Sequence, residues 1–226
     1  LGLVVTLRTS EKVRIYYRDS GTGARTFSTF AELTPLDGST PVKSPIGLAV
    51  GDWDGDGKQD VAVTGYVASG GANRPVLAWF WGENGGYSTA SVRVDRNIGT
   101  GDEEKGSGYD LTAWQDSPPT GSHRFAVTNY DLTQVPGIPP QTPQVYVFHQ
   151  VSGRAYDYQT LLPDTDPVLG ACPSRGISAC DLNADGRIDL VFTNANNGRL
   201  RWSPQLPSGS FDSIPTDPGP GSVLSL

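Results

Sequence analysis

The chain has 226 residues and a mass of 24.0 kDa, and its 17 basic and 24 acidic residues give a net charge of −7. Because it contains 28 glycines and 18 prolines, scattered along the whole sequence, a helical bundle is excluded and many short strands joined by turns are favoured. A content of 36% apolar residues argues against disorder, and the absence of a ~20-residue apolar run argues against a membrane span. The net negative charge disfavours nucleic acid and anionic membranes as partners.

A β-rich run that ends in threonine recurs four times, and it defines an internal repeat. In chain order the runs are Leu3–Thr6, Val61–Thr64, Phe125–Thr128 and Leu190–Thr193. Each run is followed by a second apolar or aromatic strand, at Val13–Tyr17, Val76–Trp81, Val145–Phe148 and Leu200–Trp202. A glycine turn and one aromatic residue come next, and these aromatic residues are Phe27, Tyr87, Tyr156 and Phe211. Three units also have a strand before the threonine run, at 47–50, 111–114 and 176–179.

One repeat therefore consists of strands A, B, C and D in about 60 residues, which is typical of a β-propeller blade. We predict a single all-β domain over residues 1–226, a β-propeller of about four four-stranded antiparallel blades. The repeat units are 1–36 with 221–226, then 47–95, 109–163 and 176–214. A β-sandwich of irregular hairpins is the alternative. Core packing between blades is the expected role of Trp79 and Trp81, and the loops 65–74, 97–109 and 130–144 are the expected sites of specificity.

The first unit lacks its strand A, and the last six residues, 221–226, resemble the missing strand. Pairing of the two ends would close the ring and remove the exposed sheet edges. The other possibility is that the chain is a segment of a larger propeller. Since the sequence contains no Met, we expect a processed or excised piece in which no signal peptide remains.

Two units carry an acidic loop between strands A and B. Residues 52–60 read DWDGDGKQD and residues 181–189 read DLNADGRID, and both fit D-x-[DN]-x-D-G-x-x-D. Ca²⁺ takes about six to eight oxygen ligands, so we expect one ion in each loop, held by side chains at positions 1, 3, 5 and 9 and by the carbonyl at position 7. The expected ligands are Asp52, Asp54, Asp56, Lys58 and Asp60 in the first loop, and Asp181, Asn183, Asp185, Arg187 and Asp189 in the second. An EF-hand is rejected because its loop needs a Glu at position 12 and a helix on each side. The alternative to a calcium site is a metal-free Asp/Gly hairpin turn.

Segments 47–63 and 176–192 resemble FG-GAP/VCBS repeats, which are the calcium-binding blades of integrin-α-like β-propellers. The resemblance is weaker over residues 1–36 and degenerate over 109–163, where the loop 115–123 loses the carboxylates at ligand positions 1, 3, 5 and 9 and is expected to bind no metal. The resemblance implies that calcium stiffens the loop between strands A and B. It also implies a secreted or cell-surface protein that binds proteins or glycans.

The two cysteines, Cys172 and Cys180, are eight residues apart. One disulfide in an oxidising compartment is the favoured interpretation, and two free buried thiols are the alternative. The two histidines, His123 and His149, have no neighbouring Ser or Cys motif, and the sequence contains neither G-x-S-x-G nor a P-loop.

The sequence therefore predicts an extracellular, calcium-stabilised recognition or adhesion module that binds protein or glycan without catalysis. The chain is expected to form a homo-oligomer or to adjoin neighbouring domains. Two other functions stay open: a hydrolase or lyase acting on polysaccharide, and a purely architectural module of an extracellular assembly.

Overall fold

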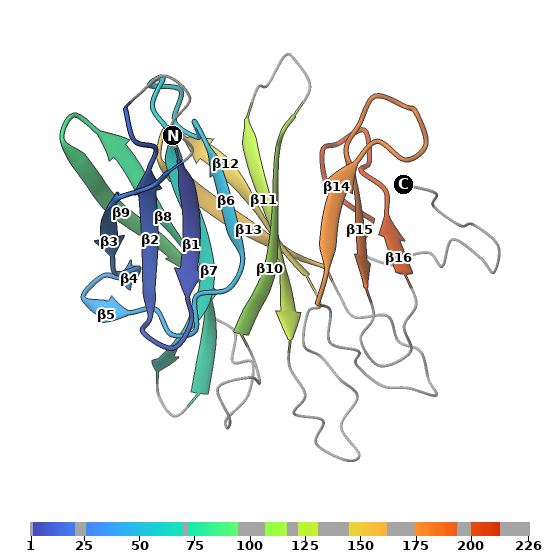
Figure 1. The fold of residues 1–226 in the computed structure, drawn as a ribbon. Coiled ribbons are helices and arrows are strands. Elements are labelled where there is room, and N and C mark those ends of the chain that lie inside the picture. Colours follow the sequence, from blue (N-terminus) through green and yellow to red (C-terminus); the bar gives the residue numbers. More distant parts are fainter. Residues whose placement is uncertain are drawn as a thin grey trace.

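The computed structural model describes residues 2–20, 26–69, 72–94, 107–116, 122–130, 145–161, 175–193 and 200–212. All regular structure in these ranges is β-strand, and no helix within them has the length and hydropathy of a membrane-crossing segment. The strands form four main antiparallel sheets that follow one another along the chain (Figure 1).

Each sheet is a meander in which every strand pairs with the next one in sequence. Sheet 1 contains β1 (Leu3–Leu7), β2 (Lys12–Tyr17) and β3 (Thr29–Leu33). Sheet 2 contains β6 (Leu48–Gly51), β7 (Asp60–Ser69), β8 (Ala72–Glu83) and β9 (Gly86–Arg93). Sheet 3 contains β10 (Ser107–Gln115), β11 (His123–Tyr130), β12 (Val145–Ser152) and β13 (Ala155–Leu161). Sheet 4 contains β14 (Ile177–Cys180), β15 (Asp189–Thr193) and β16 (Leu200–Ser203), and a small hairpin of β4 (Leu36–Asp37) and β5 (Thr40–Pro41) lies beside β9.

The predicted strand order A-B-C-D is confirmed in sheets 2 and 3, and it is incomplete at both ends of the chain. Sheet 1 has no described strand before β1. In sheet 4 the described part of the expected strand D pairs through an isolated bridge between Gln205 and Phe211. Pro204 precedes Gln205 and has no N–H to donate to a ladder, although its carbonyl accepts the N–H of Asp212 at 3.1 Å.

The predicted loop at residues 65–74 is wrong. Here β7 and β8 continue as a paired hairpin in which Gly65 faces Val76 and Ser69 faces Ala72. The extension is stable because Tyr66 and Val67 are buried and because the backbone of Tyr66 also pairs with Lys43. Most of the other two predicted specificity loops lies outside the described residues, as does the predicted terminal strand 221–226.

The repeated threonine ties strand A to strand B in each unit that has both. The Oγ1 atoms of Thr64, Thr128 and Thr193 accept hydrogen bonds from backbone N–H groups at 3.1, 2.8 and 2.9 Å. The three donors, Gly47, Asp110 and Gly176, occupy the same place in the repeat, directly before Leu48, Leu111 and Ile177. A valine would leave each of these amides without its partner, so the threonine in the motif has a specific structural cause.

Consecutive sheets bury apolar faces against each other, because alternate side chains of a strand point to opposite faces. Sheets 1 and 2 enclose Val13, Ile15, Val61, Val63 and Phe80. Sheets 2 and 3 enclose a larger aromatic cluster that includes Trp79, Trp81, Phe125, Phe148 and Tyr156. Sheets 3 and 4 enclose a third cluster that includes Val145, Val147, Leu190, Phe192 and Phe211. The predicted packing role of Trp79 and Trp81 is confirmed, since each is 1% exposed.

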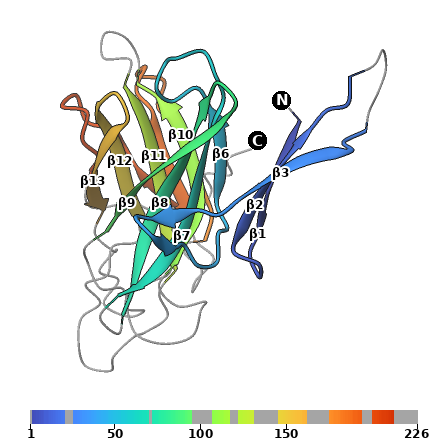
Figure 2. The ribbon, with the colours of Figure 1, turned by 90° about the vertical axis from the view of Figure 1, so that its left-hand side faces the viewer.

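The sheets therefore form a row with sheet 1 at one end and sheet 4 at the other (Figures 1 and 2). The all-β class is confirmed. Within the described ranges the strands form no closed barrel or ring, so the propeller stays a prediction.

Candidate metal centre

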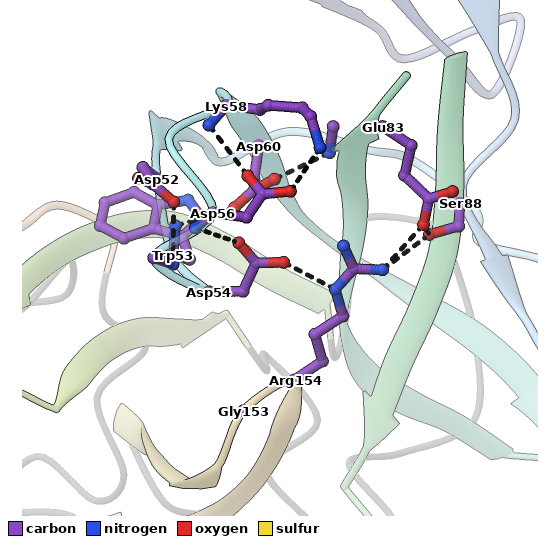
Figure 3. Close-up of polar contacts among 12 residues, drawn as sticks. Asp52, Trp53, Asp54, Asp56, Lys58, Asp60, Glu83, Ser88, Gly153 and Arg154 are labelled. Atoms are coloured by element: carbon purple, nitrogen blue, oxygen red, sulfur yellow. Dashed lines mark hydrogen bonds and ion pairs between the residues drawn. The ribbon is translucent and has the colours of Figure 1, made fainter. Parts of the chain in front are cut away.

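Three carboxylates of the first acidic loop, residues 52–60 between β6 and β7, lie close together (Figure 3). Oxygen atoms of Asp52, Asp54 and Asp60 all lie within 4.8 Å of one another. Asp60 is fully buried, whereas the other two are partly exposed. The structure thus brings together positions 1, 3 and 9 of the predicted ligand set.

The loop backbone wraps around these side chains through short-range hydrogen bonds. Asp52 accepts from the N–H groups of Gly55 and Gly57, both at 2.9 Å, and Asp54 accepts from that of Asp56 at 3.1 Å. Gly55 and Gly57 have φ values of 79° and 82°, which glycine adopts without the steric penalty of a Cβ. The alternation of aspartate and glycine in the sequence therefore specifies the loop conformation locally.

Asp60 anchors the loop to the sheet. Its Oδ2 accepts the N–H of Trp53 and its Oδ1 accepts that of Gly82 on β8, both at 2.8 Å. Burial raises the pKa of this carboxyl group despite the two backbone N–H donors, and the charges of Asp54 and Asp56 raise it further. A cation beside Asp60 would offset the cost of burying its charge.

Position 5 of the first loop lies outside the cluster. Asp56 accepts the N–H of Lys58 at 2.9 Å and forms an ion pair with the Lys58 ammonium at 2.7 Å. The structure does not bring Asp56 to the other carboxylates, because its own neighbour two residues along the chain holds it.

The second acidic loop, residues 181–189 between β14 and β15, repeats the same backbone wrapping. Asp181 accepts from the N–H groups of Asp185 and Gly186 at 3.1 and 2.9 Å. Asp189 is buried like Asp60, and it accepts from Leu182 at 3.2 Å and from Gln205 at 3.0 Å. The two loops are therefore structural equivalents, as the repeat predicts.

The side chains of the second loop gather less closely than those of the first. Asn183 replaces a carboxylate at position 3, and its Nδ2 donates to Asp185 at 2.9 Å. The guanidinium of Arg187 also pairs with Asp185. Among the described residues no three acidic groups of this loop meet the spacing found in the first loop. We therefore regard the first loop as the better defined of the two candidate sites.

The sequence gives no sign of Arg154, which reaches the first loop from the turn between β12 and β13 of sheet 3 (Figure 3). Its Nε lies 2.7 Å from Asp54 Oδ2 and its Nη1 lies 2.8 Å from Glu83 Oε1. The guanidinium also lies over the ring of Trp81, 5.3 Å from the centroid. A single arginine 100 residues away from its partner carries no motif, so only the packing of the sheets reveals it.

The carbonyl oxygen of Trp53, at position 2, joins the first loop to sheet 3. His123 Nδ1 lies 3.0 Å from it, and the side chains of Gln150 and Tyr156 each donate to it at 3.3 Å. The Trp53 ring makes edge contacts with Phe125 and His123 of sheet 3, at centroid distances of 5.0 and 5.5 Å. The first acidic loop is thus part of the junction between sheets 2 and 3.

Cys180 ends β14 as an exposed residue with no disulfide among the described residues, and the pKa of its thiol is raised by partial burial and by Asp189 and Asp181. Cys172 lies outside the described residues. The disulfide between them is not seen and stays a prediction.

A scan of protein-family models and searches of curated proteins and of solved structures find no match to this chain. The resemblance to FG-GAP/VCBS repeats therefore rests on the sequence segments quoted above.

Proposed function

We propose that the chain is a calcium-stabilised recognition module of β-propeller type, which acts outside the cell and binds a protein or glycan without catalysis. The observation that carries this proposal is the clustering of Asp52, Asp54 and Asp60 within 4.8 Å in a loop whose sequence alternates acidic residues and glycines. The donors are all oxygen atoms, which is the ligand type that Ca²⁺ prefers.

The charge of the cluster supports a divalent cation. Three carboxylates lie close together. Among the described residues, Arg154 forms an ion pair with this cluster, and it does so through Asp54 alone. A bound Ca²⁺ would supply two positive charges at the point where Asp54 and Asp60 otherwise repel each other. Asp52, Asp54 and Asp60 would hold the ion in the first loop, with Asp181, Asn183 and Asp189 as their equivalents in the second.

A structural role for the ion follows from the position of the loop. Its Trp53 carbonyl is held by His123, Gln150 and Tyr156, so fixing the loop also fixes sheet 3 against sheet 2. Repetition of the same meander, with the same threonine contact in three sheets, supports the propeller architecture. The extracellular setting and the class of partner rest on the family resemblance.

Calorimetric titration of the chelator-stripped chain with CaCl₂ tests the metal site. We expect the Asp54→Ala variant to lose binding at the first loop, because it removes one of three clustered carboxylates. Asp157→Ala is the matched control, since Asp157 is an exposed acid on β13 outside both loops. Equal calcium binding by the wild type and Asp54→Ala would contradict the assignment.

The recognition role needs a separate assay. A glycan array and a polysaccharide hydrolysis assay on the same preparation, each in calcium and in EGTA, distinguish binding from turnover. Retention of a glycan without cleavage supports the proposal, whereas release of shortened products would show an enzyme instead.

A further inference from the structure

A polar pocket of about 360 Å³ lies between sheet 1 and the segment that leads into sheet 2. The turn between β1 and β2 contributes Arg8, Thr9 and Glu11 to its lining, and the segment between β5 and β6 contributes Lys43 and Ser44. Ligand pockets in proteins usually measure about 300–1,000 Å³, so this one has room for a single small group.

The wall that carries Lys43 is held against β7. The Lys43 N–H donates to the Tyr66 carbonyl at 2.7 Å, and the Tyr66 N–H donates back to the Lys43 carbonyl at 3.1 Å. A Cβ on Gly65 would lie 2.5 Å from the Lys43 carbonyl oxygen, so a glycine is needed for this close approach. Tyr66 is six residues beyond Asp60 on β7, roughly 20 Å along an extended strand, so the pocket is separate from the first acidic loop.

Each wall of the pocket contains a residue whose backbone conformation is uncommon outside glycine. Glu11 has a φ of 57° and Ser44 has a φ of 44°. In the described part of the chain, the one other non-glycine residue with a positive φ is Ala184, in the second acidic loop. Such conformations gather at ligand-binding positions, because the surrounding structure must hold them in place.

An ion pair joins the two walls and leaves the pocket with an excess of positive charge. The Lys43 ammonium lies 2.7 and 2.8 Å from the two carboxylate oxygens of Glu11. An ammonium carries three N–H donors, so one is left to face a ligand. With Arg8 the lining has two cations and one carboxylate, in a chain whose net charge is −7. A local excess of positive charge favours a ligand with an anionic group.

Ser44 supplies an unused polar group in the lining. Its side chain is 4% exposed, and its hydroxyl has no hydrogen-bond partner among the described residues. Since buried hydroxyls are normally hydrogen-bonded, a ligand in the pocket would complete this one. Glu11 limits the ligand further, because its carboxylate accepts hydrogen bonds from hydroxyl groups but repels a molecule that is anionic throughout.

We propose that this pocket binds one acidic sugar unit of a glycan. The sugar carboxylate faces Arg8 and Lys43, and the sugar hydroxyls exchange hydrogen bonds with Glu11, Ser44 and the exposed Thr9. A neutral sugar leaves the positive charge unmatched, and a simple anion has no hydroxyl groups for Ser44 and Glu11. This inference rests on the proposed recognition function, and it names the class of glycan and the site that holds it.

Nuclear magnetic resonance titration of the whole ¹⁵N-labelled chain in calcium buffer tests the pocket. The probes are D-glucuronate and D-glucose, which differ only in the carboxylate at C6, and sodium acetate, which has the carboxylate without the sugar. D-glucuronate should shift the backbone amide signals of Glu11 and Ser44. It should bind about tenfold more tightly than either of the other two, because one charge-assisted hydrogen bond is worth about this factor.

Two variants locate the binding site. Arg8→Gln should weaken D-glucuronate about tenfold and leave D-glucose unchanged. Ser44→Gly should weaken both sugars about fivefold and should melt no lower than the wild type, because glycine adopts a φ of 44° freely. Loss of binding in Ser44→Gly is thus distinguished from loss of fold. Arg175→Gln is the control, since it removes the same charge from an exposed arginine just before β14.

Equal affinities for D-glucuronate and D-glucose, or for D-glucuronate and acetate, would overturn the acidic-sugar assignment. Wild-type affinity in both Arg8→Gln and Ser44→Gly would place the sugar elsewhere and overturn the pocket. The glycan array and hydrolysis assay separate this inference from the proposed function. A chain that ignores D-glucuronate but retains a glycan on the array overturns only the pocket, whereas a chain that binds D-glucuronate and cleaves polysaccharide overturns only the non-catalytic role.

Discussion

Replacing Asp60 by asparagine should destabilise the protein even when no calcium is present. The Asp60 carboxylate is 0% exposed and accepts two backbone hydrogen bonds, from Trp53 and from Gly82, both at 2.8 Å. An asparagine side chain keeps one acceptor oxygen and places an NH₂ group where the second oxygen was. One backbone N–H then faces a donor and loses its partner.

The size of the effect follows from burial. An unsatisfied buried donor costs about 1–3 kcal/mol, and relief of the buried charge offsets part of this cost. A net loss of about 2 kcal/mol lowers Tm by roughly 4–8 °C in a domain of this length. Asp189→Asn should behave in the same way, because Asp189 is equally buried and accepts from Leu182 and Gln205.

Thermal melts in EGTA followed by circular dichroism provide the measurement. Asp56→Asn is the control: its side chain is 29% exposed, and asparagine can still accept the N–H of Lys58, so Tm should move by less than about 2 °C. If Asp60→Asn melted at the wild-type temperature, the argument that this side chain anchors the loop would be refuted.

Three further variants test other parts of the account. Thr128→Val should lower Tm by roughly 4–8 °C, because it removes the acceptor of the Asp110 N–H. Thr29→Val on exposed β3 is the control and should leave Tm unchanged, so equal melting temperatures of the two variants would contradict the role given to the repeated threonine. Ala184→Gly should raise the free energy of unfolding by up to about 1 kcal/mol in urea titrations, because Ala184 has a φ of 59°, and Gly55→Ala should lower it, because Gly55 has a φ of 79°. The opposite order would show that backbone strain at position 4 of the two acidic loops does not affect stability. Arg154→Met should tighten calcium binding about fivefold by calorimetry, since it removes on the order of 1 kcal/mol of repulsion between the guanidinium and a Ca²⁺ ion beside Asp54 while keeping an unbranched side chain over Trp81. Arg93→Met is the control, and weaker binding in Arg154→Met would show that the guanidinium assists the site.

The strands and the acidic loops could be predicted because their causes are local. Alternating β-branched and aromatic residues between glycine turns specify the meanders, and each threonine acts within its own sheet. The hydrogen bonds of Asp52 and Asp181 reach only to residues within five positions, so the loop conformation can be read from the repeat.

Contacts between sheets could not be predicted in this way. Arg154 meets Asp54 across 100 residues, and Gln205 meets Asp116 across 89. Asp56 has the correct spacing for a ligand but pairs with Lys58, because a flexible ammonium two residues away competes for its oxygens. The hairpin at 65–74 is missed because Gly65, Gly70 and Gly71 suggest a loop, whereas burial of Tyr66 and Val67 favours continued pairing.

Calcium binding by the intact chain tests the central claim most directly. A thermal melt of the chelator-stripped protein with free Ca²⁺ at about 100 times Kd should show a gain of about 2.7 kcal/mol per occupied site. This gain raises Tm by roughly 5–11 °C for one site, and EGTA should reverse it. The first loop should contribute this gain, and Asp54→Ala should lose it. An identical melting temperature in calcium and in EGTA would contradict the calcium site and the structural role assigned to it.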